Sequence, residues 1–257
     1  MSIYTTEITS ENLTSDNPIH QRLLYAYTAT SPLVYGDVLE IGCGEGRGID
    51  LMRGNFKSYT AVDKIAGMIN KLAVKYPDGK FITMNLPPLK GLADNSFDTI
   101  VSFQVIEHIA NDKEYLKEIS RVLKPGGKVY ITTPNRPMSL SRNPWHEREY
   151  IGPELEAIAK PFFSDLKVDG IFGSKRFIAY HDRNRESVNK IMKWDIFKLQ
   201  YRLPASILRI PYEFANRFNR NTLLKANDDL VKSISQEDFF IAPYKKDAID
   251  LFLVAKK

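Results

Sequence analysis

Four glycines alternate at positions 42, 44, 46 and 48, directly after an apolar run over 37–41 that contains Glu40. An apolar run that stops at glycines is typical of a buried strand leaving a sheet. Glycine allows a tight turn and a close approach of the backbone to a ligand, and a helix start beyond it presents free N–H groups. The loop therefore predicts a nucleotide-type binding site.

The spacing of these glycines limits which class of nucleotide the loop can bind. A dinucleotide fingerprint requires Gly-x-Gly-x-x-Gly. In each possible register the third glycine is replaced, by Arg47, Ile49 or Leu51. The sequence therefore does not favour a dinucleotide fold of the NAD-binding kind.

A second acidic residue, Asp63, ends the next predicted strand, 21 positions after Gly42. A carboxylate at this place can accept hydrogen bonds from both hydroxyls of a ribose. The alternative is an exposed acid at a strand end with no ligand. The glycine loop before it favours the ribose-binding interpretation.

Two histidines are candidates for a general base, because imidazole titrates near neutral pH. His108 follows the fourth predicted strand in the pair Glu107-His108, which could also anchor that loop. His146 lies in the polar and aromatic segment 143–150 and is our first choice; it could instead order Glu147 or Tyr150. His146 with Glu147 and Glu149 has no diagnostic metal-ligand spacing, so we expect no metal.

Alternating strands and helices must position these residues. The expected strands cover about 37–41, 58–62, 80–84, 97–103 and 128–133, with two late strands at 165–172 and 248–256. Helices are expected near 17–30, up to 53 after the glycine loop, 65–75 and 112–123. This order predicts an α/β fold: a doubly wound, mostly parallel seven-stranded sheet with helices on both faces, an antiparallel last strand and a helical insertion between the last two strands.

The expected organisation has four parts. Residues 1–35 form an N-terminal lid with a helix, 36–173 the nucleotide-binding core, 174–247 a helical cap over the acceptor, and 248–257 the last core strand. The carboxyl ends of the parallel strands meet at one edge, where ligands bind in such sheets.

Three further motifs agree in order and spacing with the glycine loop and Asp63: Ser96-Phe97-Asp98, Glu107-His108 and Leu123-Lys124-Pro125-Gly126-Gly127. Over about 36–135 the chain resembles the Rossmann-like, class I methyltransferases that use S-adenosylmethionine (SAM), in their small-molecule branch. The resemblance implies SAM as cofactor and S-adenosylhomocysteine as product. It implies methyl transfer to a small molecule, and we expect a hydroxyl oxygen as the acceptor atom.

The resemblance also implies positions for the cofactor. Glu40, Gly42 and Gly44 should surround the methionine part, with Cys43 as a small residue of the same loop, and Gln104 should approach the methionine end. Asp63 should hold the ribose, and Lys64, Ile65, Asn85 and Leu86 should lie beside the adenine, where Asn85 replaces an acid common in the family. Arg22, on the N-terminal helix, is expected to pair with the SAM carboxylate. Two alternatives stay open: a SAM-binding protein without catalysis, and a nucleotide-dependent oxidoreductase or nucleotide-sugar enzyme of the same fold.

The composition is that of an ordered globular chain: 257 residues, 43% apolar and 26% charged. Cys43 is the only cysteine, so an intramolecular disulfide and a cysteine zinc site are excluded. We see no signal peptide and no apolar run long enough to span a membrane, and expect a cytoplasmic protein.

The net charge of +5 is concentrated in one segment, since residues 174–225 contain twelve Lys/Arg and four Asp/Glu. Apolar and basic residues mix over 184–203, before Pro204. This segment could be a cap packed on the sheet edge, a lid that shapes the acceptor pocket, or a surface for an anionic membrane or substrate. We therefore expect a small-molecule acceptor, anionic or lipid-linked, with peripheral membrane contact through 185–220. We expect no nucleic-acid partner, and the sequence does not define the oligomeric state.

Overall fold

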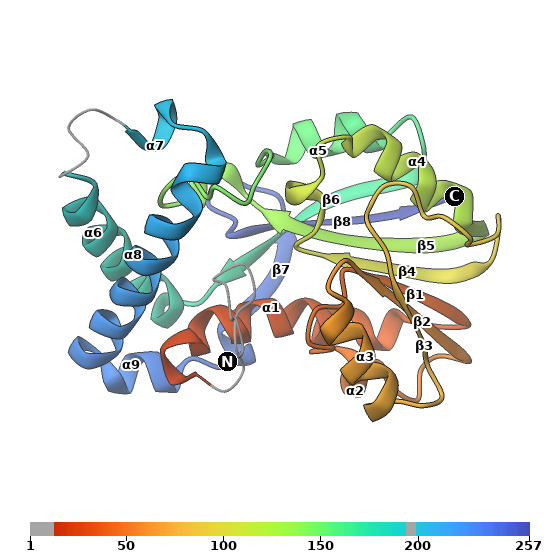
Figure 1. Cartoon of the computed structure of the whole chain (residues 1–257), viewed down its shortest axis with the longest axis horizontal. Helices are drawn as coiled ribbons and strands as arrows, with labels where there is room; N and C mark the ends of the chain where they lie inside the picture. Colours follow the sequence, from red (N-terminus) through yellow and green to blue (C-terminus); the bar gives the residue numbers. More distant parts are fainter. Residues whose placement is uncertain (1–12, 194–198) are drawn as a thin grey trace.

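One eight-stranded sheet crosses the structure, a computed structural model that describes residues 13–193 and 199–257 (Figure 1). The strands lie in the order β3-β2-β1-β4-β5-β8-β6-β7. Their bounds are β1 Asp37–Ile41, β2 Ser58–Asp63, β3 Lys80–Thr83, β4 Phe97–Phe103, β5 Leu123–Pro134, β6 Ser164–Gly173, β7 Phe239–Pro243 and β8 Asp250–Lys256.

The direction of chain growth reverses between β1 and β4. From β1 the sheet grows outward through β2 and β3, and the chain then returns to place β4 on the other side of β1. The loops after β1 and β4 therefore leave in opposite directions, which opens a crevice at the carboxyl ends of these strands. β8 pairs antiparallel with both β5 and β6.

Helices cover both faces of the sheet. One face carries α4 (Asp112–Val122) and α5 (Gly152–Ala159), and the other carries α1 (Asn17–Thr30), α2 (Ile49–Met52) and α3 (Ala66–Lys75) (Figure 1). Short 3₁₀ turns occur at Thr14–Asp16, Ser31–Leu33, Ile106–His108, Arg136–Met138 and Gln236–Asp238.

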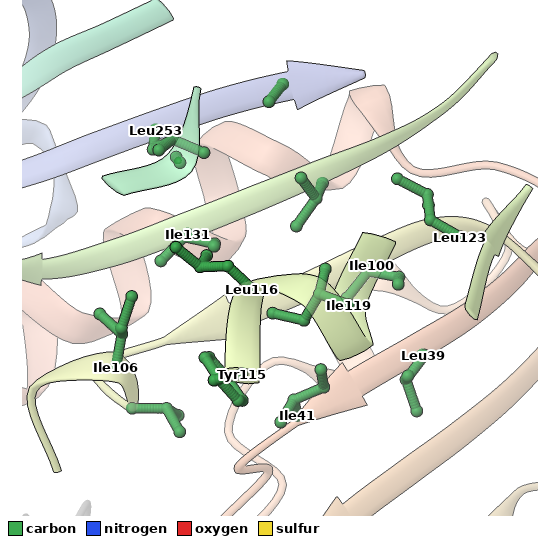
Figure 2. Close-up of a cluster of buried hydrophobic side chains, with 14 of the residues drawn as sticks. Leu39, Ile41, Ile100, Ile106, Tyr115, Leu116, Ile119, Leu123, Ile131 and Leu253 are labelled. Atoms are coloured by element: carbon green, nitrogen blue, oxygen red, sulfur yellow. The ribbon is translucent and has the colours of Figure 1, made fainter. Parts of the chain in front are cut away.

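Strand β1 shows why both faces are apolar. Val38 packs in the core of the α1–α3 face, whereas its neighbour Leu39 packs in the core under α4, and both are fully buried. Figure 2 shows Tyr115, Leu116 and Ile119 of α4 among the side chains of the central strands, such as Ile41, Ile100 and Ile131. A parallel sheet covered on both faces requires successive apolar residues, and β1 supplies them at Val38, Leu39 and Ile41, with Glu40 as the buried exception.

The helical insertion contains α6 (Lys175–Met192), α7 (Leu199–Arg202), α8 (Ala205–Ala226) and α9 (Asp228–Ser233). Helix α8 starts directly after Pro204, which is its N-cap residue. These helices gather at one end of the molecule, on the left in Figure 1. Part of the predicted segment, from Trp194 to Lys198, lies outside the described residues.

The N-terminal helix and the insertion are joined by buried polar contacts. The Asn17 side chain donates to the backbone carbonyls of Val231 (2.8 Å) and Ile234 (2.9 Å). The Asp16 carboxylate is fully buried and pairs with Arg217 (2.8 Å) and Arg220 (3.2 Å) of α8. The predicted division into segments 1–35 and 174–247 stays a prediction, but these segments pack against each other.

The sheet has one strand more than the seven predicted. β7 lies inside the segment predicted as a helical insertion and pairs antiparallel with β6 at the edge of the sheet. Its sequence, Phe-Phe-Ile-Ala-Pro, is a short apolar run that periodicity alone does not distinguish from a buried helix segment. Its pairing also depends on the free edge of β6, which no local sequence reveals. Among the described residues no helix is both long and apolar enough to cross a bilayer; the cytoplasmic location stays a prediction.

Candidate active site

The glycine-rich loop begins directly at the carboxyl end of β1. Gly42 and Gly44 have φ values of +79° and +50°, in the left-handed region. A Cβ on Gly42 would lie 2.3 Å from Cγ2 of Val105, so only glycine fits there. A Cβ on Gly44 would meet no protein atom within 4 Å, because Gly44 borders an open cavity. The loop thus brings backbone to the edge of the cavity with no side chain in the way.

Asp63, at the end of β2, ties the loops of two strands together. Its Oδ2 accepts a hydrogen bond from the Gly44 N–H and its Oδ1 accepts one from the Ile65 N–H, both at 2.9 Å. The residue is 8% exposed and borders the cavity. Each carboxylate oxygen has a further lone pair for a ligand hydroxyl.

The cavity at the β1–β4 crevice has a volume of about 270 Å³. Most of the predicted cofactor-binding residues border it: Gly42, Cys43, Gly44, Asp63, Lys64, Ile65, Asn85, Leu86 and Gln104. The candidate base His108 also borders it. Burial raises the pKa of the Cys43 thiol, so this residue is a small uncharged part of the loop.

Glu40 does not line the cavity, although it was predicted to contact the cofactor; it lies buried beneath the lining residue Tyr27. Its side chain is 1% exposed, and it accepts hydrogen bonds from the hydroxyls of Tyr27 (2.7 Å) and Tyr59. Burial raises the pKa of the Glu40 carboxyl to about 7, although both hydrogen bonds lower it. Tyr27 itself borders the cavity, so Glu40 holds a wall of the site, on α1, against the sheet.

Arg22 also lies outside the cavity lining. Its guanidinium forks onto the buried Asp250, with Nε–Oδ2 at 2.7 Å and Nη2–Oδ1 at 2.8 Å. Gln104, which has a φ of +57°, donates to the same carboxylate at 3.3 Å. Asp250 therefore connects α1, the end of β4 and the start of β8, and the expected contact of Arg22 with the cofactor stays a prediction.

The two histidines lie edge to face, with ring centroids 4.9 Å apart, but differ in their hydrogen bonds. His146 uses both ring nitrogens, with Nε2 2.8 Å from the Asn143 amide nitrogen and Nδ1 2.7 Å from Oε1 of Glu149. His108 uses Nδ1, 2.8 Å from the backbone carbonyl of Trp145. Because a carbonyl only accepts, Nδ1 of His108 carries the proton, and Nε2 of the neutral ring keeps its lone pair. Nε2 of His108 lies 4.0 Å from Glu107, beyond hydrogen-bond distance.

Residues 39–131, which supply most of this cavity, match the family model described as a methyltransferase domain. The chain contains a class I, SAM-dependent methyltransferase domain. Its cofactor is SAM, and we name the cavity at the β1–β4 crevice, which most of the predicted cofactor-binding residues border, the cofactor cavity.

Relatives of this methyltransferase domain are found in bacteria. The chain is 36% identical over 164 residues to a Mycobacterium tuberculosis protein named a probable SAM-dependent methyltransferase, which covers 62% of this chain and 57% of that protein. It is 32% identical over 125 residues to a ubiquinone biosynthesis O-methyltransferase of Idiomarina loihiensis, covering 47% of this chain and 50% of the relative. The matches thus span about half of the length of these relatives.

A solved SAM-dependent methyltransferase from Thermotoga maritima has the same fold, with a TM-score of 0.56 and 16% identity. The alignment covers 93% of this chain and 91% of that one. At this identity the likeness establishes the fold, with helices and strands beyond the methyltransferase domain included.

Glu107, His108 and His146 bring one nitrogen or oxygen each within 4.8 Å of one another. This trio differs from the set considered from the sequence, because Glu147 is exposed and takes no part. In the trio, Oε2 of Glu107 accepts from the Thr133 hydroxyl at 2.9 Å, and both His146 nitrogens are engaged. Hydrogen bonds among protein groups therefore account for the arrangement, and the absence of a metal stays a prediction.

Several cavity residues were not expected from the sequence. They are Leu23 and Tyr27 of α1, Glu45 and Arg47 of the glycine loop, and Met84, Phe103, Val105 and Ile109 near the ends of β3 and β4. Most directly neighbour a motif residue, and this adjacency was the signal available. Leu23 directly follows the predicted Arg22 on α1, whereas Tyr27 lies one turn further along this helix and neighbours no motif residue.

Proposed function

We propose that the protein transfers the methyl group of SAM to a hydroxyl oxygen of a small molecule, with His108 as the base. The observation that supports this role is the hydrogen bond from Nδ1 of His108 to the Trp145 carbonyl. It orients the ring so that Nε2 is the nitrogen without a hydrogen bond in the described part of the chain, and His108 borders the cofactor cavity. His146, our first choice from the sequence, has both nitrogens engaged and does not border that cavity.

The residues of the cavity fit SAM. Asp63 has lone pairs for the two ribose hydroxyls, and the side chains of Ile65, Met84 and Leu86 offer apolar contact for an adenine ring. Asn85 offers an amide oxygen that can accept from the adenine amino group. The open space beside Gly44 accommodates the methionine part next to backbone N–H groups.

The chemistry demands little of the protein beyond alignment and proton removal. SAM supplies a methyl group that its sulfonium already activates. Nε2 of His108 accepts the proton of the acceptor hydroxyl, while the oxygen forms a bond to the methyl carbon and the carbon–sulfur bond breaks. S-adenosylhomocysteine and the methyl ether leave, and the imidazolium returns its proton to solvent.

We propose that the acceptor is lipid-linked or anionic and reaches the base from the cap. A second cavity, the cap cavity of about 210 Å³, lies between α6, α8 and residues 141–144. Its apolar lining includes Ile191, Leu208 and Tyr212, with Arg142 as a basic group. The next residue of the 141–144 loop, Trp145, supplies the carbonyl that orients His108. An apolar tail in the cap cavity would thus place a head group toward the base.

Radiolabelled SAM with a panel of phenols, alcohols and amines tests this function. We expect label in an O-methyl product, with S-adenosylhomocysteine formed in equal amount. His108→Gln should lower kcat by about 10²- to 10⁴-fold, as expected for a lost general base, with little change in SAM affinity. His146→Gln is the matched variant, since its ring lies nearby but does not border the cavity. A loss of kcat in His146→Gln alone would contradict the assignment.

A further inference from the structure

Helix α8 carries a row of apolar side chains that faces solvent, which we name the outer stripe. It consists of Ile207, Ile210, Phe214 and Phe218, whose exposed fractions are 58%, 68%, 75% and 69%. Spacings of three and four residues put these side chains on one face of the helix. A soluble helix ordinarily turns such a face toward a core, so the outer stripe is an apolar surface without a partner among the described residues.

The core-facing side of α8 is a different set of residues. Leu208, Tyr212, Ala215 and Asn219 line the cap cavity, and Leu223 is buried against the protein. Helix α8 therefore has two apolar faces. The inner face already explains how α8 packs, so the outer stripe is not needed for the fold.

The surroundings of the outer stripe are basic. Residues 199–226 contain five Arg or Lys and one acidic residue, Glu213. Asp16 pairs with both Arg217 and Arg220, which leaves a net charge of one positive unit on these three residues. Arg202, before α8, and Lys225, in its last turn, are exposed and have no ion-pair partner in the described part of the chain. The stripe is thus bordered by positive charge at each end.

We propose that the outer stripe docks on the surface of an anionic lipid bilayer, with Phe214 and Phe218 inserted among the lipid chains. Apolar insertion and attraction of Lys or Arg to anionic head groups are the two contributions that hold amphipathic helices at such surfaces. A second copy of the chain is the less suitable occupant, because a symmetric contact between two stripes would bring two basic helices together.

The docking deepens the proposed function and rests on it where the acceptor is concerned. Pro211 and Leu208 line the cap cavity and lie next to the outer stripe on the same helix. A bilayer against the stripe would therefore lie beside the cap cavity, and a lipid-linked acceptor could enter it without crossing water.

Flotation with vesicles tests the docking on the full chain. The vesicles are phosphatidylcholine alone or phosphatidylcholine mixed with phosphatidylglycerol. We expect partition into the mixed vesicles, with at least about a tenfold loss in the double variant Phe214→Ser and Phe218→Ser, since each large apolar side chain removed from water favours binding. Val74→Ser is the matched control, because Val74 is 85% exposed on α3, and it should change nothing. Arg202→Gln with Lys225→Gln should lower partition only where phosphatidylglycerol is present.

Equal partition of the wild type and the double phenylalanine variant would overturn the docking, as would failure of the wild type to bind the mixed vesicles. Sedimentation velocity distinguishes the other occupant: a dimer that becomes monomeric in the double variant, without vesicle binding, would assign the stripe to a second copy. SAM affinity and methyl transfer to soluble acceptors, measured without vesicles, report on the proposed function separately. All variants should keep the wild-type circular dichroism spectrum, since the altered side chains are exposed.

Discussion

The cofactor cavity and the cap cavity are built by different means. At the β1–β4 crevice the ligand site is made by backbone: left-handed glycines, strand ends and an aspartate that accepts from two main-chain N–H groups. Between α6 and α8 the site is made by side chains on helices. A backbone-built site specifies one cofactor and tolerates little change, whereas a side-chain-built site can be altered one residue at a time. If the cap cavity receives the acceptor, as proposed, this difference lets one fold keep its cofactor and vary its acceptor.

The largest expected effect contrasts the helices of the two regions. Leu116 of α4 is fully buried under the sheet, whereas Phe214 of α8 is 75% exposed. Leu116→Ala should lower the free energy of unfolding by about 2–5 kcal/mol because it leaves a cavity. Phe214→Ala should change it by no more than about 0.5 kcal/mol. Urea denaturation measures both, and a comparable loss in Phe214→Ala would mean that the stripe packs against protein.

The buried Glu40, which lies behind the cofactor cavity, should make the free energy of unfolding depend on pH. The pKa of Glu40 is raised from 4.5 to about 7, mainly by burial. The stability from this group is therefore present below about pH 4.5 and is lost as the pH rises through about 7, by about 3 kcal/mol. Glu40→Gln carries no charge, so its stability relative to wild type should rise by that amount. Denaturation across this pH range checks it, with the exposed Glu156→Gln as control; parallel profiles for wild type and Glu40→Gln would contradict it.

One methyl group added to the glycine loop should weaken cofactor binding far more than it lowers stability. Gly44 and Gly91 both have positive φ, and a Cβ on either meets no protein atom within 4 Å. Alanine at either position should cost about 1 kcal/mol of stability for the left-handed backbone. Only Gly44→Ala projects into the cofactor cavity, so it alone should weaken SAM binding, by about a hundredfold. Calorimetry measures both variants, and unchanged SAM affinity in Gly44→Ala would place the cofactor elsewhere.

The smallest expected effect is on the KM for the acceptor, when the cap cavity is filled. Ala215→Trp fills the cap cavity, which Ala215 lines. It should raise the KM for acceptors with an apolar tail about tenfold, as expected for lost apolar contacts, and leave SAM affinity unchanged. Ala226→Trp, on an exposed position of the same helix, is the control. A rise in the dissociation constant of SAM would show that the two cavities are not independent.

The cofactor half could be predicted from the sequence because its determinants are local. Gly42, Gly44 and Asp63 act through their own backbone conformation or through neighbours at strand ends, so spacing alone located them. The α1 helix was predicted with the bounds observed, since Asn17-Pro18 is a strong start signal. The alternation of strands and helices predicted the mostly parallel sheet, whereas the order of its strands was observed only in the structure.

The remaining features depend on partners distant in the sequence. Arg22 donates hydrogen bonds to Asp250, and Tyr59 donates one to Glu40. Each pair is too far apart in the sequence for a local pattern to predict it. The preference for His108 over His146 depends on which ring nitrogen meets the Trp145 carbonyl. Strand β7 forms because it pairs with the free edge of β6, a contact that the sequence does not show. In each case a tertiary contact determined the outcome that the sequence left open.

We infer that the cavity at the β1–β4 crevice binds SAM and that the glycine loop and Asp63 build this site. Isothermal titration of the full chain with SAM, S-adenosylhomocysteine and NAD measures this binding. We expect one site for SAM and S-adenosylhomocysteine, lost in Asp63→Ala, and no heat with NAD. Binding of NAD without binding of SAM would contradict it.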